Sequence, residues 1–129
     1  MIGLIQVERQ KPHKKLQLWS KAIDLVVYLY GITKHFPHEE EFGLKSQLRR
    51  AAVSVPSNIS EGLTRRTKND KIHFLNMAQG SLSEIDAQIE ISHRLDFINE
   101  TINIDANERL SEVERLLSGL IRNIRGKDL

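Results

Sequence analysis

The chain has 129 residues, 40% of them hydrophobic, a formal net charge of +2 and no cysteine. This length suits one compact domain with its own core, and the lack of cysteine excludes disulfides, thiolate metal sites and a cysteine nucleophile. No apolar run approaches the roughly 18 residues that cross a bilayer, and the N-terminal residues lack a secretory cleavage pattern, so we expect a cytoplasmic protein without membrane attachment.

The charge is distributed unevenly along the sequence. Basic residues dominate from Arg9 to Lys71, whereas the segment from Glu84 to Glu100 contains five acidic residues and one arginine, Arg94. Such asymmetry suits either a basic surface for nucleic acid or complementary faces that meet between subunits. Net charge does not choose between these alternatives.

Residues 1–15 are predicted to be a tail outside the folded domain. They contain Pro12 and four basic side chains, and Ile2 to Val7 forms either a disordered segment or an extended one that docks on a neighbour. A first helix then follows, closed by Phe36 and Pro37, because its apolar residues recur at three- and four-residue steps. The residues predicted to form its buried stripe are Trp19, Ala22, Ile23, Val26, Tyr30 and Thr33.

A long second helix is predicted after Glu39, Glu40 and Glu41, whose negative charge suits a helix N-terminus. Its apolar stripe is Leu44, Leu48, Ala51 or Ala52, Val55, Ile59 and Leu63. Pro56 lies inside this stripe and costs roughly 3 kcal/mol in a helix interior, so we expect a kink there. The proline leaves the Ala52 carbonyl without its amide donor, and a nearby Ser or Asn side chain is expected to replace it, with Asn58 as one candidate.

Small residues are concentrated on the second helix and predict close packing on the third. They are Ala51, Ala52, Ser54, Ser57, Ser60 and Gly62, with Ala78, Gly80 and Ser81 as the facing set. A backbone can approach such a surface closely. The alternative is that the kink and the small residues shape an interface between subunits.

Two more helices complete the pattern. Thr67 and Asp70 resemble a capping box ahead of Phe74, Leu75, Ala78, Leu82, Ile85 and Ile89. After a polar stretch from Asn99 to Asn103, Asp105 is predicted to cap a last helix that contains Leu110, Val113, Leu117, Leu120 and Ile124 and ends at Gly126. No segment alternates as a strand would, so we predict an all-α, antiparallel up-down four-helix bundle over residues 16–129 with a proline-kinked second helix.

Catalytic and metal chemistry find little support in this sequence. Glu90 and His93 have the Glu-x-x-His spacing of di-iron bundles, and Asp70 and His73 are a looser match, but both pairs fall on one helix whereas the chemistry needs two. The serines lie in helical patterns, without a nucleophile elbow, and no glycine-rich phosphate loop is present. We therefore predict a non-enzymatic protein without catalytic residues, metal or cofactor.

Basic residues flanking the proline motif are the candidates for nucleic-acid binding. They are Lys45, Arg49, Arg50, Arg65, Arg66, Lys68 and Lys71. Guanidinium groups bind phosphate oxygens in pairs, and clustered cations gain free energy from counterion release. The alternative is a solvated helix face with local ion pairs to Glu39 to Glu41 and to Glu61. Aromatic residues, which would favour base stacking, are not interleaved with this set in the sequence.

Several motifs in a fixed order resemble one family. They are Leu18 to Ala22, Phe36-Pro37, the unbroken run from Gly43 to Gly62, and Phe74 to Glu84. Over roughly Leu16 to Ile124 the chain resembles the four-helix bundle proteins also called 23S rRNA intervening-sequence proteins. The resemblance implies a small bacterial protein, often encoded within intervening sequences of large-subunit rRNA genes, that assembles as a ring-like homopentamer and supplies no catalytic residue.

A similar barrel-shaped pentamer is the accessory protein of diversity-generating retroelements, which engages a reverse transcriptase and nucleic acid through basic surfaces. By analogy, we expect a homo-oligomer that associates with RNA or DNA through its basic surfaces. Two positions depart from the family pattern: Ser60 stands where alanine is common, and Gln79 stands where a basic residue is common. The alternative expectation is an oligomeric scaffold or accessory protein that binds a protein partner and no nucleic acid.

Overall fold

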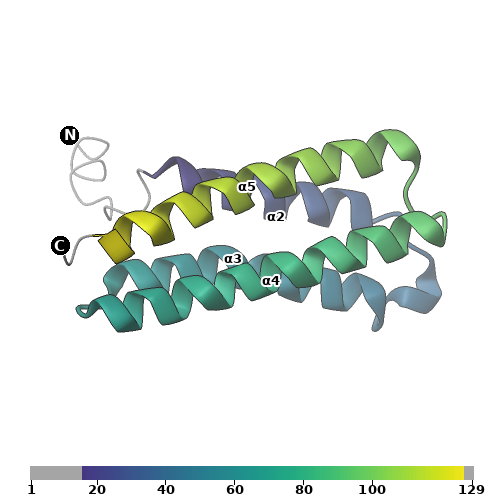
Figure 1. Cartoon of the computed structure of the whole chain (residues 1–129). Helices are drawn as coiled ribbons and strands as arrows, with labels where there is room; N and C mark the ends of the chain where they lie inside the picture. Colours follow the sequence, from purple (N-terminus) through teal and green to yellow (C-terminus); the bar gives the residue numbers. More distant parts are fainter. Residues whose placement is uncertain (1–15, 127–129) are drawn as a thin grey trace, which may run out of the picture.

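The computed structural model describes residues 16–126, which fold into four long helices and one short 3-10 turn. The elements in chain order are α2 (Gln17–Thr33), η2 (His38–Glu40), α3 (Leu44–Thr64), α4 (Lys68–Arg94) and α5 (Glu100–Gly126). α3 packs on α2 and α4, and α5 packs on the same two helices, so the four helices surround one core (Figure 1). The all-helical, four-helix fold is confirmed, whereas the predicted tail at residues 1–15 lies outside the described residues.

The buried face of α2 differs from the predicted stripe. Its buried residues are Leu18, Ala22, Leu25, Leu29 and Thr33. Of the predicted stripe, Ala22 and Thr33 are buried, Trp19 and Val26 are half-buried against the core, and the prediction was wrong at Tyr30, which is 37% exposed. α2 is apolar on two adjacent faces, and helical spacing alone does not show which face enters the core. The second face is half-buried at Trp19 and Val26 and exposed at Val27 and Tyr30.

α3 buries the predicted residues Leu48, Val55 and Ile59, and Pro56 is buried within a continuous helix from Leu44 to Thr64. The expectation for Asn58 was wrong, because its side-chain amide donates to the Ser54 carbonyl at 2.9 Å and not to the Ala52 carbonyl. A side chain in a helix reaches the carbonyl one turn before it, whereas Ala52 is six residues away. The kink at Pro56 stays a prediction.

The predicted close packing of α3 on α4 is present at both Gly62 and Ser54. A β-carbon at Gly62 would lie 3.1 Å from the Lys71 carbonyl oxygen, and the Ser54 hydroxyl donates to the Ser81 hydroxyl. Gly80 takes no part in this contact, because it is exposed and a β-carbon there would meet nothing within 4 Å. The close approach is therefore confined to one side of α4.

α4 and α5 each begin directly after a residue whose side chain caps the helix. The Thr67 hydroxyl accepts a hydrogen bond of 3.1 Å from the Asp70 amide, which confirms the predicted cap of α4. α5 begins six residues before the predicted position, because Asn99 Oδ1 accepts from the Ile102 amide at 2.8 Å. Asp105, the predicted cap, lies inside the helix and pairs with Arg109 at 3.2 Å. Asn and Asp cap helices about equally well, so the sequence alone did not distinguish them.

We expect the two glycines of the α3–α4 pair to respond in opposite directions to alanine. Gly80→Ala should raise the free energy of unfolding by about 0.5–1 kcal/mol, because alanine restricts the unfolded chain and meets no neighbour. Gly62→Ala should lower it by about 1 kcal/mol, because the Lys71 carbonyl belongs to a helical backbone that cannot rotate away. Urea unfolding of both variants tests this, and an equal gain in both would contradict the close contact.

Tyr28 provides a pH-dependent link between α2 and α5. Its hydroxyl donates to the Ile102 carbonyl at 3.3 Å, and burial, followed by the charge of Asp105, raises the pKa of Tyr28 to about 12. Since this pKa is about 10 in the unfolded chain, folding favours the neutral phenol. The stabilisation is complete below pH 10 and is lost between pH 10 and 12. We expect the free energy of unfolding to fall more steeply over that range in the wild type than in Tyr28→Phe, and parallel curves would exclude this role.

Candidate nucleic-acid interface

The seven candidate cations form two groups at opposite ends of the bundle. Lys45, Arg49 and Arg50 lie in the first two turns of α3, and the other four surround the turn from α3 to α4. Figure 1 shows that turn near the C-terminal end of α5, far from the α2–α3 connection. At about 1.5 Å per residue, Arg50 and Arg66 are separated by roughly 24 Å along the helix axis. The set is therefore two sites and not one continuous patch.

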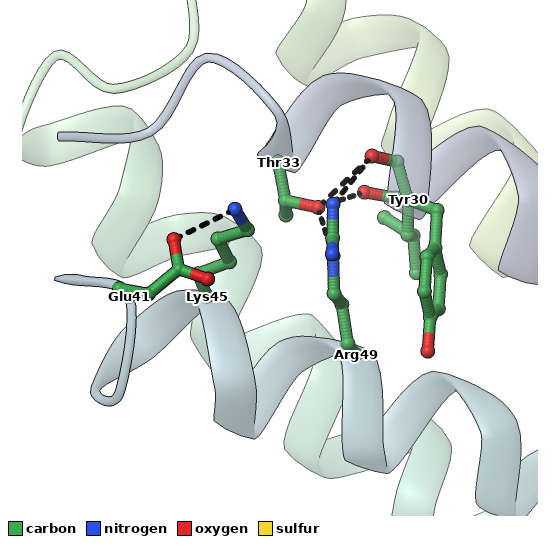
Figure 2. A network of polar contacts seen from close by, with 6 residues as sticks. Tyr30, Thr33, Glu41, Lys45 and Arg49 are labelled. Carbon is green, nitrogen blue, oxygen red and sulfur yellow. Dashed lines mark hydrogen bonds and ion pairs between the residues drawn. The ribbon is translucent and has the colours of Figure 1, made fainter. Parts of the chain in front are cut away.

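Two cations of the first group are held by groups of their own chain. Lys45 Nζ pairs with Glu41 Oε1 at 2.9 Å, and this hydrogen bond and charge lower the pKa of Glu41. Arg49 Nε donates to Thr33 Oγ1 at 2.9 Å and Nη2 donates to the Tyr30 carbonyl at 3.1 Å. Its guanidinium also lies 4.4 Å from the centroid of the Tyr30 ring (Figure 2). Arg49 therefore fastens the end of α2 to the start of α3.

Arg50 is different from its neighbour. It is exposed and, within residues 16–126, forms no hydrogen bond or ion pair. It borders an open surface hollow of about 520 Å³, which we call the Phe42 hollow. The residues that line it are Tyr30, Glu41, Phe42, Lys45, Ser46, Arg49, Arg50 and Val53.

The Phe42 hollow contains two aromatic side chains whose position beside the cations was not predicted from the sequence. Phe42 is 94% exposed and follows directly after three glutamates, so nothing in the helical spacing singled it out. Tyr30 belongs to α2 and is brought to these cations only by the packing of α2 on α3. Aromatic residues are thus not interleaved with the cations in the sequence, but Tyr30 and Phe42 lie beside three of them at the surface.

Three of the four cations in the second group also contact their own chain. Arg65 pairs with Glu61 at 3.0 Å and covers the Phe74 ring at 4.5 Å. Lys68 Nζ donates to the Arg125 carbonyl at 2.7 Å, and Lys71 Nζ donates to the Leu63 carbonyl at 3.3 Å. Arg66 is exposed and, in the described part of the chain, makes neither a hydrogen bond nor an ion pair. Of the predicted local pairs to Glu39 to Glu41 and to Glu61, those with Glu41 and Glu61 are present. Among the seven candidates, Arg50 and Arg66 are the two guanidinium groups without a hydrogen-bond or ion-pair partner within residues 16–126.

The acid and histidine pair considered for a metal does not converge. Glu90 pairs with Arg94 at 2.7 Å, while His93 Nε2 lies 3.0 Å from Glu100 on α5. Among residues 16–126 no group of three or more His, Asp or Glu side chains is placed to hold a metal ion.

In the same residues, no helix has both the length and the apolar character that a bilayer crossing requires.

An apolar face lies beside the Phe42 hollow, along α2 and α3. A hollow of about 250 Å³ is lined there by Trp19, Ile23, Val26, Val27, Val53, Pro56, Ser57 and Ser60, which we call the α2–α3 apolar face. Val27 is 66% exposed.

Ser60, one of the two departures from the family pattern, accepts a hydrogen bond of 2.9 Å from the Trp19 indole nitrogen. Gln79, the other departure, lies 3.5 Å from Ser118 and contributes to the contact between α4 and α5.

Comparison with known proteins places this fold. The sequence profile of the 23S rRNA-intervening sequence protein family matches residues 14–119. The chain belongs to this family.

A solved structure supports the fold. A protein of unknown function from the S23 ribosomal protein family of Bacteroides thetaiotaomicron has 24% sequence identity and a TM-score of 0.76, over 81% of this chain and 95% of that one. No curated protein matches the chain. The family and its neighbour therefore establish a common helical fold and assign no activity to it.

Replacing Arg49 and replacing Arg50 should have different effects on the free energy of unfolding. Arg49→Ala should lower the free energy of unfolding by about 1 kcal/mol, because it removes two hydrogen bonds and a cation–π contact between helices. Arg50→Ala, its matched control one residue away, should change it by less than about 0.5 kcal/mol. Denaturant unfolding compares the two variants, and equal losses would refute the structural role of Arg49.

Proposed function

We propose that this protein is non-enzymatic, assembles with copies of itself, and associates with RNA or DNA phosphates through Arg50 and Arg66. The observation that carries the proposal is the difference between these two side chains and the other five candidates. Lys45, Arg49 and Arg65 contact an acid or a ring of their own chain, whereas Arg50 and Arg66 are exposed and, within residues 16–126, form no hydrogen bond, ion pair or cation–π contact. A guanidinium free of a carboxylate binds two phosphate oxygens in a fixed geometry.

Self-assembly is supported by the α2–α3 apolar face and by the family's implied homopentamer. Val27 and Val53 remain exposed on a face that already contains the half-buried Trp19. Contiguous apolar surface of this kind is typical of protein interfaces. In a closed ring each copy would repeat Arg50 and Arg66, so weak phosphate contacts would add up to useful affinity.

The arrangement of helices within each copy supports the same proposal. The first turn of α2 contacts the last turns of α3 through Trp19 and Ser60, and the end of α2 contacts the start of α3 through Thr33 and Arg49. This order supports the up-down antiparallel bundle, and a bend at Pro56 would follow the curve of α3 around the core. Both basic sites then project from the ends of each bundle.

A scaffold that binds a protein partner is the second candidate. The specific observation in its favour is that the α2–α3 apolar face carries no charged residue in its lining. A partner held there would bind with little dependence on salt, because apolar burial is not screened.

Binding across a salt series distinguishes the two functions. The purified protein should bind a structured rRNA fragment, an unrelated RNA and a DNA, with affinity that falls steeply as salt rises. The double variant Arg50→Ala/Arg66→Ala should bind more weakly, and its log–log slope against salt should be shallower by roughly 0.7–0.9 for each phosphate that it no longer binds. The matched control is Arg115→Ala/Arg122→Ala, which removes two exposed arginines from α5.

Oligomeric mass is measured in the same buffers, so that loss of assembly is not mistaken for loss of binding. Equal binding by the double variant and the wild type would refute the assignment of Arg50 and Arg66. An intact oligomer that binds no nucleic acid at low salt would favour the protein-partner scaffold.

A further inference from the structure

We infer that the Phe42 hollow binds an unpaired nucleotide of RNA or DNA, with the base stacked on Phe42 and a phosphate held by Arg50. The inference rests on the proposed nucleic-acid association and specifies its ligand: a single strand and not a duplex. It also explains why an exposed aromatic ring lies beside three cations.

Phe42 offers an accessible aromatic face. It lies in the short connection between η2 and α3, is 94% exposed, and stacks on no other ring in the described chain. Tyr30, in contrast, already has the Arg49 guanidinium over its ring at 4.4 Å. Stacking of a base on an exposed aromatic ring removes apolar area from water and does not depend on base identity.

The charges around Phe42 match a nucleotide better than an apolar peptide. The hollow contains three cations, Lys45, Arg49 and Arg50, against one carboxylate, Glu41. Glu41 is engaged by Lys45, and Arg49 is fixed by Thr33 and Tyr30, so the phosphate partner is Arg50. A nucleotide supplies both a flat apolar surface and a negative charge, whereas an apolar partner would leave the excess positive charge unmatched.

Two hydrogen bonds fix the backbone elements next to the hollow. Arg49 joins the end of α2 to α3, and the Glu40 carboxylate accepts from the Leu44 amide at 2.9 Å at the start of α3. Its volume of about 520 Å³ falls within the roughly 300–1,000 Å³ of small-ligand sites. The backbone on either side of the hollow is therefore fixed, and only the exposed side chains of Phe42 and Arg50 would be ordered when a base enters.

Comparing the affinity for a single strand with that for a duplex distinguishes base stacking on Phe42 from simple attraction of phosphates. We would measure fluorescence anisotropy of a labelled 12-nucleotide RNA, alone and annealed to its complement, with the same pair in DNA. Phe42→Ala should weaken single-strand binding about tenfold and leave duplex binding within twofold, because bases in a duplex are already stacked. Met77→Ala, which shortens an exposed apolar side chain on α4, is the matched control and should change neither.

Phe42→Trp provides a second readout that does not depend on affinity alone. It should retain single-strand binding, and the emission of the introduced indole should be quenched when the single strand is added. Oligomeric mass is determined for every variant under the same conditions.

Each other outcome has a defined meaning. If Arg50→Ala/Arg66→Ala weakens binding but Phe42→Ala does not, the proposed function stands and the stacking site is refuted. If Phe42→Ala instead lowers the oligomeric mass, Phe42 is a contact between copies and the inference is overturned. If neither single strand nor duplex binds the wild type at low salt, the inference and the nucleic-acid function fail together.

Discussion

The close approach of α3 to α4 at Gly62 determines which faces of α3 remain outside the core. Gly62 lets the α3 backbone approach the Lys71 carbonyl so closely that a β-carbon there would lie 3.1 Å from its oxygen, so this face of α3 lies against α4. Leu48, Val55 and Ile59 are thereby directed into the core. Arg50 is two residues beyond Leu48, about 200° further around the helix, so it is directed to solvent. The exposure of the candidate phosphate-binding group thus follows from a packing constraint at the opposite end of the helix.

Arg49 and Arg50 show how one step along a helix changes the role of a side chain. Arg49 lies at the edge of the buried face, close enough to α2 to reach Thr33 and the Tyr30 carbonyl. Thr33 is itself buried, and its hydroxyl donates to the Leu29 carbonyl at 2.7 Å while it accepts from Arg49. A buried hydroxyl with both functions satisfied stabilises the helix end, and the guanidinium that is engaged there is not available to a ligand.

Helix spacing predicted the four helices and most of the buried residues of α3, α4 and α5, because each of these has one dominant apolar stripe. The same spacing failed on α2, where Leu25 and Leu29 compete with Val26 and Tyr30 for the core and only the neighbouring helices decide. The predicted start of α5 was wrong for a related reason, because Asn99 and Asp105 are equally good cap residues when judged from the sequence alone. The Phe42 hollow was not predictable at all, because Tyr30 joins it across a helix interface.

The two surface hollows share a wall, and this joins the two proposals. Val53 lines both the Phe42 hollow and the α2–α3 apolar face. A second copy packed on the apolar face would therefore border the nucleotide and could change its affinity through direct contact or through the position of Val53. By linkage, any gain in nucleotide affinity on assembly equals the gain in assembly on nucleotide binding. Assembly and single-strand binding would then be coupled equilibria, and the oligomeric mass in the presence of a single strand reports the size of that coupling.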